Sequence, residues 1–109
     1  MKLPYGDQAL VEESKLTRYL LSLAHEHGRY KARFFIRLGF HPDDPEVLRQ
    51  ALLGLALESD VEEVRSTYGR KFVGRGVLQS PQGRQATVVT VWILRNGVPP
   101  PILVTAYPG

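Results

Sequence analysis

Cysteine is absent from the 109-residue chain, which excludes disulfides and thiolate metal sites. Long apolar runs are absent as well: none approaches the ~20 residues that a membrane-spanning helix needs. The first seven residues lack the apolar core of a signal peptide. The chain also has no glycine-rich phosphate loop, serine elbow or nucleotide-binding fingerprint. We therefore expect a cytoplasmic protein with no membrane anchor, no cofactor and no metal site.

The length and composition predict a single domain over residues 1–109. Apolar residues make up 43% and charged residues 23% of the chain, which is ordinary for a globular protein. The charges are unevenly spread, because residues 41–64 carry seven acidic residues against one arginine, whereas residues 65–109 carry six basic residues and no acidic one. Such a distribution is typical of a phosphate-binding face, but it also fits a sheet and a helix whose charges neutralise one another.

Three helices are predicted in the first half of the chain. Ser14 is a plausible N-cap for the first, and its apolar stripe has the spacing i, i+3, i+4 and i+7: Leu16, Tyr19, Leu20 and Leu23. Gly28 is free to take the left-handed backbone that closes a helix. A short strand is expected near residues 9–11.

The second helix is predicted from about Arg29 to Leu38, with Gly39 as its C-terminal cap. The third is predicted from Pro45 to Glu58, because Asp44 followed by a proline is a strong helix start.

After residue 60 the pattern changes to two-residue alternation, which predicts four strands: 61–68, 71–80, 85–94 and 102–107. Gly74 and Gly76 weaken the second strand and predict a bulge or a close approach there. Three helices followed by four sequential strands predict an α+β fold, with the helices packed on one face of an antiparallel meander.

The third predicted strand has two different faces. One face carries only aliphatic residues, which predict that it packs in the core: Val89, Val91 and Ile93. The other face carries Thr90 and Trp92. Together with Thr105 and Tyr107 of the last strand, the second face would show a polar and aromatic surface. Such a surface can bind a base by stacking and a phosphate by hydroxyls. It is equally compatible with a solvated face or a subunit contact.

Histidines and cations gather between His25 and Phe35. His25 can act as an acid or a base near neutral pH, which would suit a catalytic role. The alternative is that His25 is a solvent-exposed histidine at a helix end with no catalytic role. His27 is similar, and we rank it lower. Arg29 and Lys31 lie at a helix start, where the partial charge is already positive, so they favour an anion site. Alternatively they extend into solvent or pair with a nearby glutamate.

Two motifs resemble a known family. The first is His25-x-x-Gly28-Arg29-x-Lys31-Ala32-x-Phe34, and the second is Val91-Trp92 followed by Leu103-Val104-Thr105-Ala106-Tyr107-Pro108. They resemble a small bacterial family of unknown function, found alone and as a terminal domain of larger proteins. The arrangement is more distantly similar to the barnase–EndoU–colicin–RelE group of metal-independent ribonuclease toxins.

This resemblance implies an RNA-cleaving or RNA-binding domain of toxin type. It carries over His25, Lys31, Trp92, Thr105 and Tyr107 as site residues. Together with the helix-start and sheet-face patterns above, it leads us to expect catalytic roles for His25, Lys31, Thr105 and Tyr107, and phosphate or RNA contacts for Arg29, Thr90 and Trp92. The rival hypothesis is a non-catalytic interaction module, either a homodimer or a component of a toxin–immunity system with an immunity or antitoxin partner. The sequence leaves open whether the protein is an enzyme.

Overall fold

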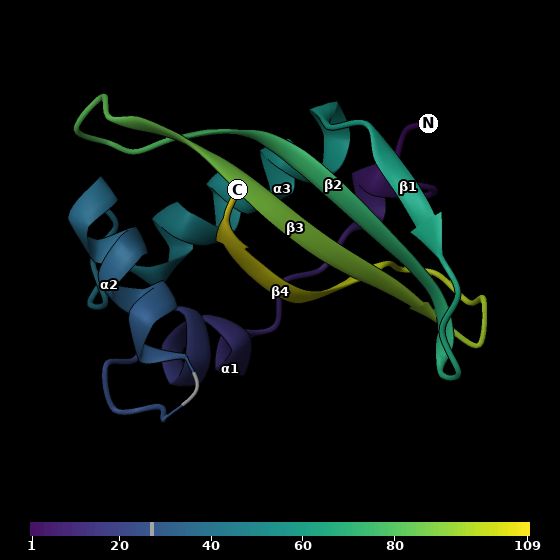
Figure 1. The fold of residues 1–109 in the computed structure, drawn as a ribbon, viewed down its shortest axis with the longest axis horizontal. Coiled ribbons are helices and arrows are strands. Elements are labelled where there is room, and N and C mark those ends of the chain that lie inside the picture. The colour runs from purple at the N-terminus through teal and green to yellow at the C-terminus, as the bar shows by residue number, and fades with distance from the viewer. Residues whose placement is uncertain (27) are drawn as a thin grey trace.

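The computed structural model describes residues 1–26 and 28–109. It forms a four-stranded antiparallel sheet in the order β1-β2-β3-β4, with the helices N-terminal to the strands (Figure 1). The α+β prediction is therefore confirmed. The strands are β1 Val61–Val64, β2 Gly69–Gln79, β3 Gln85–Arg95 and β4 Ile102–Pro108.

Helices α2 (Arg29–Leu38) and α3 (Pro45–Glu58) begin and end where the capping residues predict. Gly39 ends α2 with a φ of 127°, a conformation that favours glycine. Among the described residues, no helix is both long enough and apolar enough to cross a membrane.

The first helix differs from its prediction. It begins as α1 (Glu13–Lys15) and continues as the wider π-helical turn η2 (Leu16–Leu20). Ser14 is not the N-cap, because Glu12 occupies that position. Gly28 has a φ of −104° and directly precedes α2, so the predicted left-handed closure is wrong. The predicted strand at residues 9–11 is reduced to one isolated bridge from Leu10 to β4.

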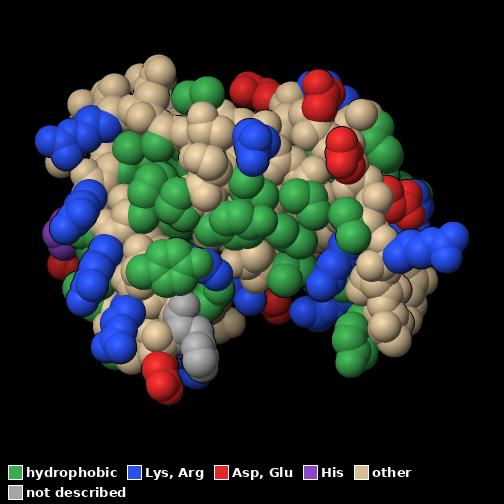
Figure 2. Space-filling view, in the orientation of Figure 1, with side chains coloured by type: hydrophobic (Ala, Val, Ile, Leu, Met, Phe, Trp, Pro, Cys, Tyr) green, Lys and Arg blue, Asp and Glu red, His purple; other side chains and the backbone are tan. Residues whose placement is uncertain are grey.

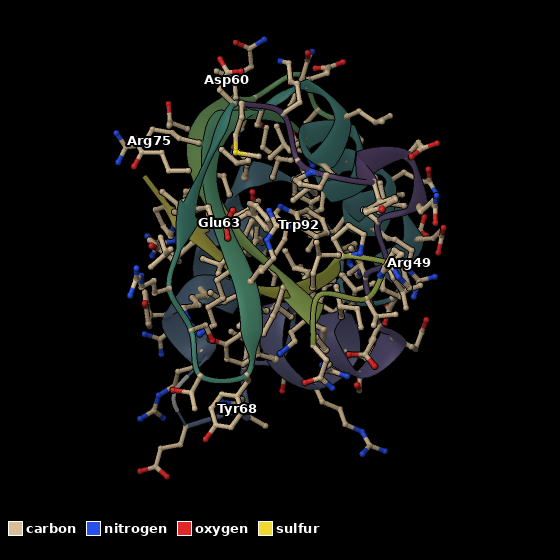
Figure 3. All side chains as sticks on the ribbon, turned by 90° about the vertical axis from the view of Figure 1, so that its right-hand side faces the viewer. Arg49, Asp60, Glu63, Tyr68, Arg75 and Trp92 are labelled. Atoms are coloured by element: carbon tan, nitrogen blue, oxygen red, sulfur yellow. The ribbon has the colours of Figure 1, made fainter. Side chains whose placement is uncertain are left out.

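The core lies on the face of β3 that the sequence analysis predicted to be open. Trp92 is 0% exposed and lies between the sheet and the helices (Figure 3), and Thr90 is 1% exposed. The indole N–H of Trp92 donates to Thr90 Oγ1 at 3.0 Å. Because this bond satisfies the indole donor, the large apolar area of the ring can be buried without a polar penalty. The predicted exposure of Thr90 and Trp92 is therefore wrong.

The aliphatic residues of β3 lie on the opposite face, which no helix covers in Figure 1, although Val89 and Ile93 are each only 6% exposed. We call it the outer face. The pairing of β3 with β4 shifts register between Val91 and Trp92, so Thr105 pairs with Val91 and Tyr107 with Val89. Thr105 and Tyr107 consequently lie on the outer face. They are separated from Trp92, whose partner is Leu103.

Gly76 makes one of the predicted close approaches. A Cβ there would lie 2.7 Å from Ser59 Oγ and 2.8 Å from Leu55 Cδ2, so the glycine lets β2 pack closely on the end of α3.

Candidate functional site

A lysine and two hydroxyl groups meet at the β4 edge of the sheet. Lys31 Nζ donates to the hydroxyl of Tyr19 and, at 3.2 Å, to Thr105 Oγ1. The two hydroxyl oxygens are themselves 3.3 Å apart. We call these three residues the Lys31 cluster. It joins η2, α2 and β4, and Lys31 and Thr105 are 74 positions apart in the chain.

The π-helical turn positions the tyrosine. Leu21 N–H donates to the carbonyl of Leu16, which closes the wide turn. Leu16 and Leu20 are fully buried and anchor this turn in the core. Tyr19 belongs to the same turn, with its partly buried ring packed against the core and its hydroxyl directed to β4.

Aromatic rings surround the Lys31 ammonium. Its Nζ lies 4.8 Å from the ring centroid of Tyr19, 5.7 Å from that of Tyr30 and 5.9 Å from that of Tyr107. A second cation, Lys15, lies 5.2 Å from the Tyr19 ring but makes no hydrogen bond to its hydroxyl in the described structure. These distances permit cation–π attraction, which helps hold a half-buried ammonium at the sheet edge.

The cluster perturbs the ionisation of Tyr19. Partial burial raises the pKa of the Tyr19 phenol, but hydrogen bonds from Lys31 and Thr105 and the charges of Lys31 and Lys15 lower it by more. The net pKa lies below the ordinary value of 10.0. Both lysines therefore favour the phenolate, the form able to accept a proton.

His25 lies beside the cluster and contacts the other edge of the tyrosine. The rings of His25 and Tyr19 pack edge to face with centroids 5.1 Å apart. His25 Nδ1 accepts the backbone N–H of Gly28 at 2.9 Å, so the neutral ring carries its proton on Nε2. Because the only lone pair of that tautomer is engaged, the geometry argues against His25 as the general base.

The structure brings some of the predicted site residues together and separates others. Lys31 and Thr105 are in direct contact, Tyr107 lies beside them, and His25 reaches them through Tyr19. Arg29 is exposed at the start of α2.

The buried pair Thr90 and Trp92 lies on the opposite face of the sheet with almost no exposed surface, so the geometry argues against the predicted RNA contact by these two residues. His27 lies outside the described residues. The sequence analysis did not identify Tyr19 as a site residue, because it assigned Tyr19 to the apolar stripe of the first helix. One signal was available: a tyrosine among leucines on a buried face usually has a hydrogen-bond partner for its hydroxyl.

A surface hollow of about 460 Å³ adjoins the cluster on the outer face. Tyr107 lines it together with Val73, Val89, Arg75, Asp60 and Glu62. This volume lies within the usual range for small-molecule sites. Among residues 1–26 and 28–109, no three or more His, Cys, Asp or Glu side chains are grouped so as to hold a metal ion.

Comparison with known proteins shows one family and one fold. No curated protein matches the chain. Among solved structures, the fold is similar to a chain of a contact-dependent growth inhibition toxin–immunity protein complex from Klebsiella pneumoniae 342. The two share 14% sequence identity with a TM-score of 0.69, over 91% of this chain and 98% of that chain. Residues 2–109 match the family described as a domain of unknown function, DUF6883. The chain belongs to the DUF6883 family.

Proposed function

We propose that this domain is a metal-independent ribonuclease of toxin type, which cleaves RNA by attack of a ribose 2′-hydroxyl on the adjacent phosphate. The observation that carries the proposal is the Lys31 cluster. It places an ammonium, a phenol with a lowered pKa and a second hydroxyl within hydrogen-bond distance of one another, next to a ligand-sized hollow.

In the proposed reaction, two tyrosines transfer the protons. The Tyr19 phenolate takes the proton from the 2′-hydroxyl, whose oxygen then bonds to phosphorus while the bond from phosphorus to the 5′-oxygen breaks. The Tyr107 phenol gives its proton to the departing 5′-oxygen. The products are a 2′,3′-cyclic phosphate and a 5′-hydroxyl end, and solvent restores both tyrosines.

Lys31 and Thr105 act on charge and position. The Lys31 ammonium stabilises the negative charge that develops on the phosphate oxygens, because it lies in a half-buried site where water screens it less. Thr105 holds the Tyr19 hydroxyl in place, and the edge contact from His25 fixes the ring. Arg29 supplies a further positive charge for the RNA backbone.

The toxin assignment has two supports. The order of helices and strands is distantly similar to that of ribonuclease toxin domains, and the fold is similar to a chain of a toxin–immunity protein complex. We therefore propose a role in a toxin–immunity system, with an immunity protein as the partner.

RNA cleavage in excess EDTA tests the proposal with a matched pair of variants. Lys31→Met removes the ammonium that donates to Tyr19 and Thr105, whereas Lys15→Met removes a cation near the same ring that donates to neither. We expect Lys31→Met to lower kcat about 10²–10³-fold, the usual loss for one electrostatic donor, and Lys15→Met to change it far less.

Two results would count against the proposal. One is a purified, folded parent protein that cleaves no RNA in EDTA. The other is equal activity in the Lys31→Met and Lys15→Met variants, which would place the chemistry elsewhere.

The outer face favours a second candidate, a non-catalytic interaction module. Its aliphatic residues carry no covering helix, and Figure 2 shows hydrophobic side chains gathered at the centre of this face. A homodimer through this face predicts a sedimentation coefficient that rises with protein concentration, and Val77→Lys, at a 60% exposed position on β2, should abolish the rise. A constant monomer would exclude the homodimer.

A further inference from the structure

We infer that the exposed side of α2 is a track for single-stranded RNA, in which Arg33 and Arg37 hold successive phosphates and Tyr30 stacks on a base beside the Lys31 cluster. This inference rests on the proposed function, because it specifies the substrate of the same site. The chemical class it identifies is an RNA strand with unpaired bases, several nucleotides long.

The arginines of α2 form one row. Arg29, Arg33 and Arg37 are spaced four residues apart, so they follow one side of the helix at intervals of about 6 Å. All three are exposed, and no ion pair among the described residues involves any of them. The helix itself contains no acidic residue. Like charges at this spacing repel and destabilise a helix, so the row is not explained by the stability of α2.

The row continues beyond the end of the helix. Arg84, from the turn between β2 and β3, donates to the backbone carbonyl of Arg37 at 2.8 Å. Arg37, Arg84 and Phe34 line a surface groove of about 430 Å³ at this end. Figure 2 shows basic side chains gathered along the side of the molecule that α2 occupies in Figure 1. Positive charge therefore extends from one end of α2 to the other.

Tyr30 connects the row to the cluster. At 100° per residue, its position on α2 falls between Arg37 and Lys31. Tyr30 is 59% exposed, yet the centroid of its ring lies only 5.7 Å from the Lys31 ammonium. An exposed aromatic ring next to a cation is the usual platform on which proteins stack unpaired bases. An RNA strand whose phosphates follow the arginines would thus place a base on Tyr30 and the next phosphate at Lys31.

An RNA strand explains these features better than another polyanion. Guanidinium groups bind phosphates in a bidentate manner, and a regular row of them suits a repeating phosphate backbone. Tyr30 has no role in binding a purely acidic surface, but it has one in binding a nucleobase.

Binding to a 2′-O-methyl RNA oligonucleotide of about ten nucleotides tests the inference without depending on cleavage, since the methyl group blocks the attacking hydroxyl. The measurement is fluorescence anisotropy over a range of salt concentrations. For the double variant Arg33→Ala/Arg37→Ala we expect the slope of log K against log salt to fall in magnitude by about 1.4, because each single-strand phosphate contact contributes about 0.7. The control is Arg65→Ala/Arg95→Ala, two exposed arginines from the opposite end of the sheet.

The stacking contact has its own matched pair. Tyr30→Ala should weaken binding roughly 5- to 150-fold, and Tyr30→Phe should retain it, because the ring face provides the contact. Tyr68→Ala is the control: Tyr68 is 76% exposed and lies in the turn after β1, far from α2 (Figures 1 and 3). It should leave binding unchanged.

The outcomes separate this inference from the proposed function. If the α2 variants lose oligonucleotide binding while the controls keep it, and the parent cleaves no RNA, the track is supported and the ribonuclease is refuted. Cleavage by the parent with unchanged binding in the α2 variants would refute the track alone. Binding of the parent to phosphatidylserine vesicles but not to the oligonucleotide would also overturn the track, in favour of a membrane surface.

Discussion

The buried pair formed by Thr90 and Trp92 allows a quantitative test of where the core lies. Thr90→Val keeps the shape of the side chain but removes the acceptor of the indole N–H, which lies 3.0 Å from Thr90 Oγ1 in a site with 0–1% exposure. Because water cannot replace the acceptor there, the cost is the full desolvation penalty of the donor, about 1–3 kcal/mol. For a domain of this size each kcal/mol lowers Tm by about 4 °C, so we expect a decrease of about 4–12 °C.

The assays are thermal denaturation, which gives Tm, and urea denaturation, which gives the free energy of unfolding; tryptophan fluorescence monitors both. Trp92 is the only tryptophan, so the signal comes from the perturbed site itself. A double-mutant cycle with Trp92→Phe, followed by circular dichroism, isolates the pair: once the indole N–H is gone, Thr90→Val should cost little. If Thr90→Val changes the free energy of unfolding by less than about 0.3 kcal/mol, below the range for a lost buried partner, the buried hydrogen bond is refuted. If it weakens RNA binding at unchanged stability, the original assignment of this face to RNA is restored.

Two further predictions concern the ionisation of Tyr19 and the backbone at two glycines. Lys31→Met should raise the Tyr19 pKa toward 10.0. A pH titration of the Tyr19 ¹³Cζ chemical shift measures this pKa, and an identical titration curve in the parent and the variant would refute the effect of Lys31 on Tyr19. Because the pKa of Tyr19 is lower in the folded state, its ionisation adds stability only as pH rises through the folded value toward the unfolded one. The stability of the parent relative to Tyr19→Phe should therefore increase as pH rises toward 10 and decrease as pH falls. Gly54→Ala should stabilise the protein by about 0.5–1 kcal/mol in urea denaturation, because α3 has open space there. Gly69→Ala should destabilise it by at least about 1–3 kcal/mol, because φ is +144° and the new Cβ would lie 2.2 Å from the carbonyl oxygen of Leu94; equal effects of the two alanines would contradict this reasoning.

Local signals in the sequence were sufficient for α2, α3 and the meander. Gly39 and Pro45 have strong backbone preferences that act whatever surrounds them, and two-residue alternation identifies strands before their partners are known. The choice of core face was different. Residue type favoured the aliphatic side of β3, but a tryptophan with a nearby threonine acceptor is an equally good core pair. Which side the helices cover depends on packing across the whole domain, and alternation alone carries no information on it.

The candidate site depends on two local irregularities that leave no clear mark in the sequence. A regular α-helical turn at residues 16–20 would direct Tyr19 differently, because a π-helical turn inserts one extra residue. The register shift next to Trp92 has the same effect in the sheet. Leu103 faces the core, and strict alternation would turn Thr105 and Tyr107 to the core as well; the shift turns them to the outer face and leaves Ala106 in the core instead. Tyr19 comes from the π-helical turn and Thr105 lies next to the register shift, so each irregularity positions one hydroxyl partner of Lys31. Bulges and π-helical turns reduce regular hydrogen bonding, and both are frequent at functional sites. Their coincidence at one lysine therefore supports a functional role for the Lys31 cluster independently of the chemistry assigned to it.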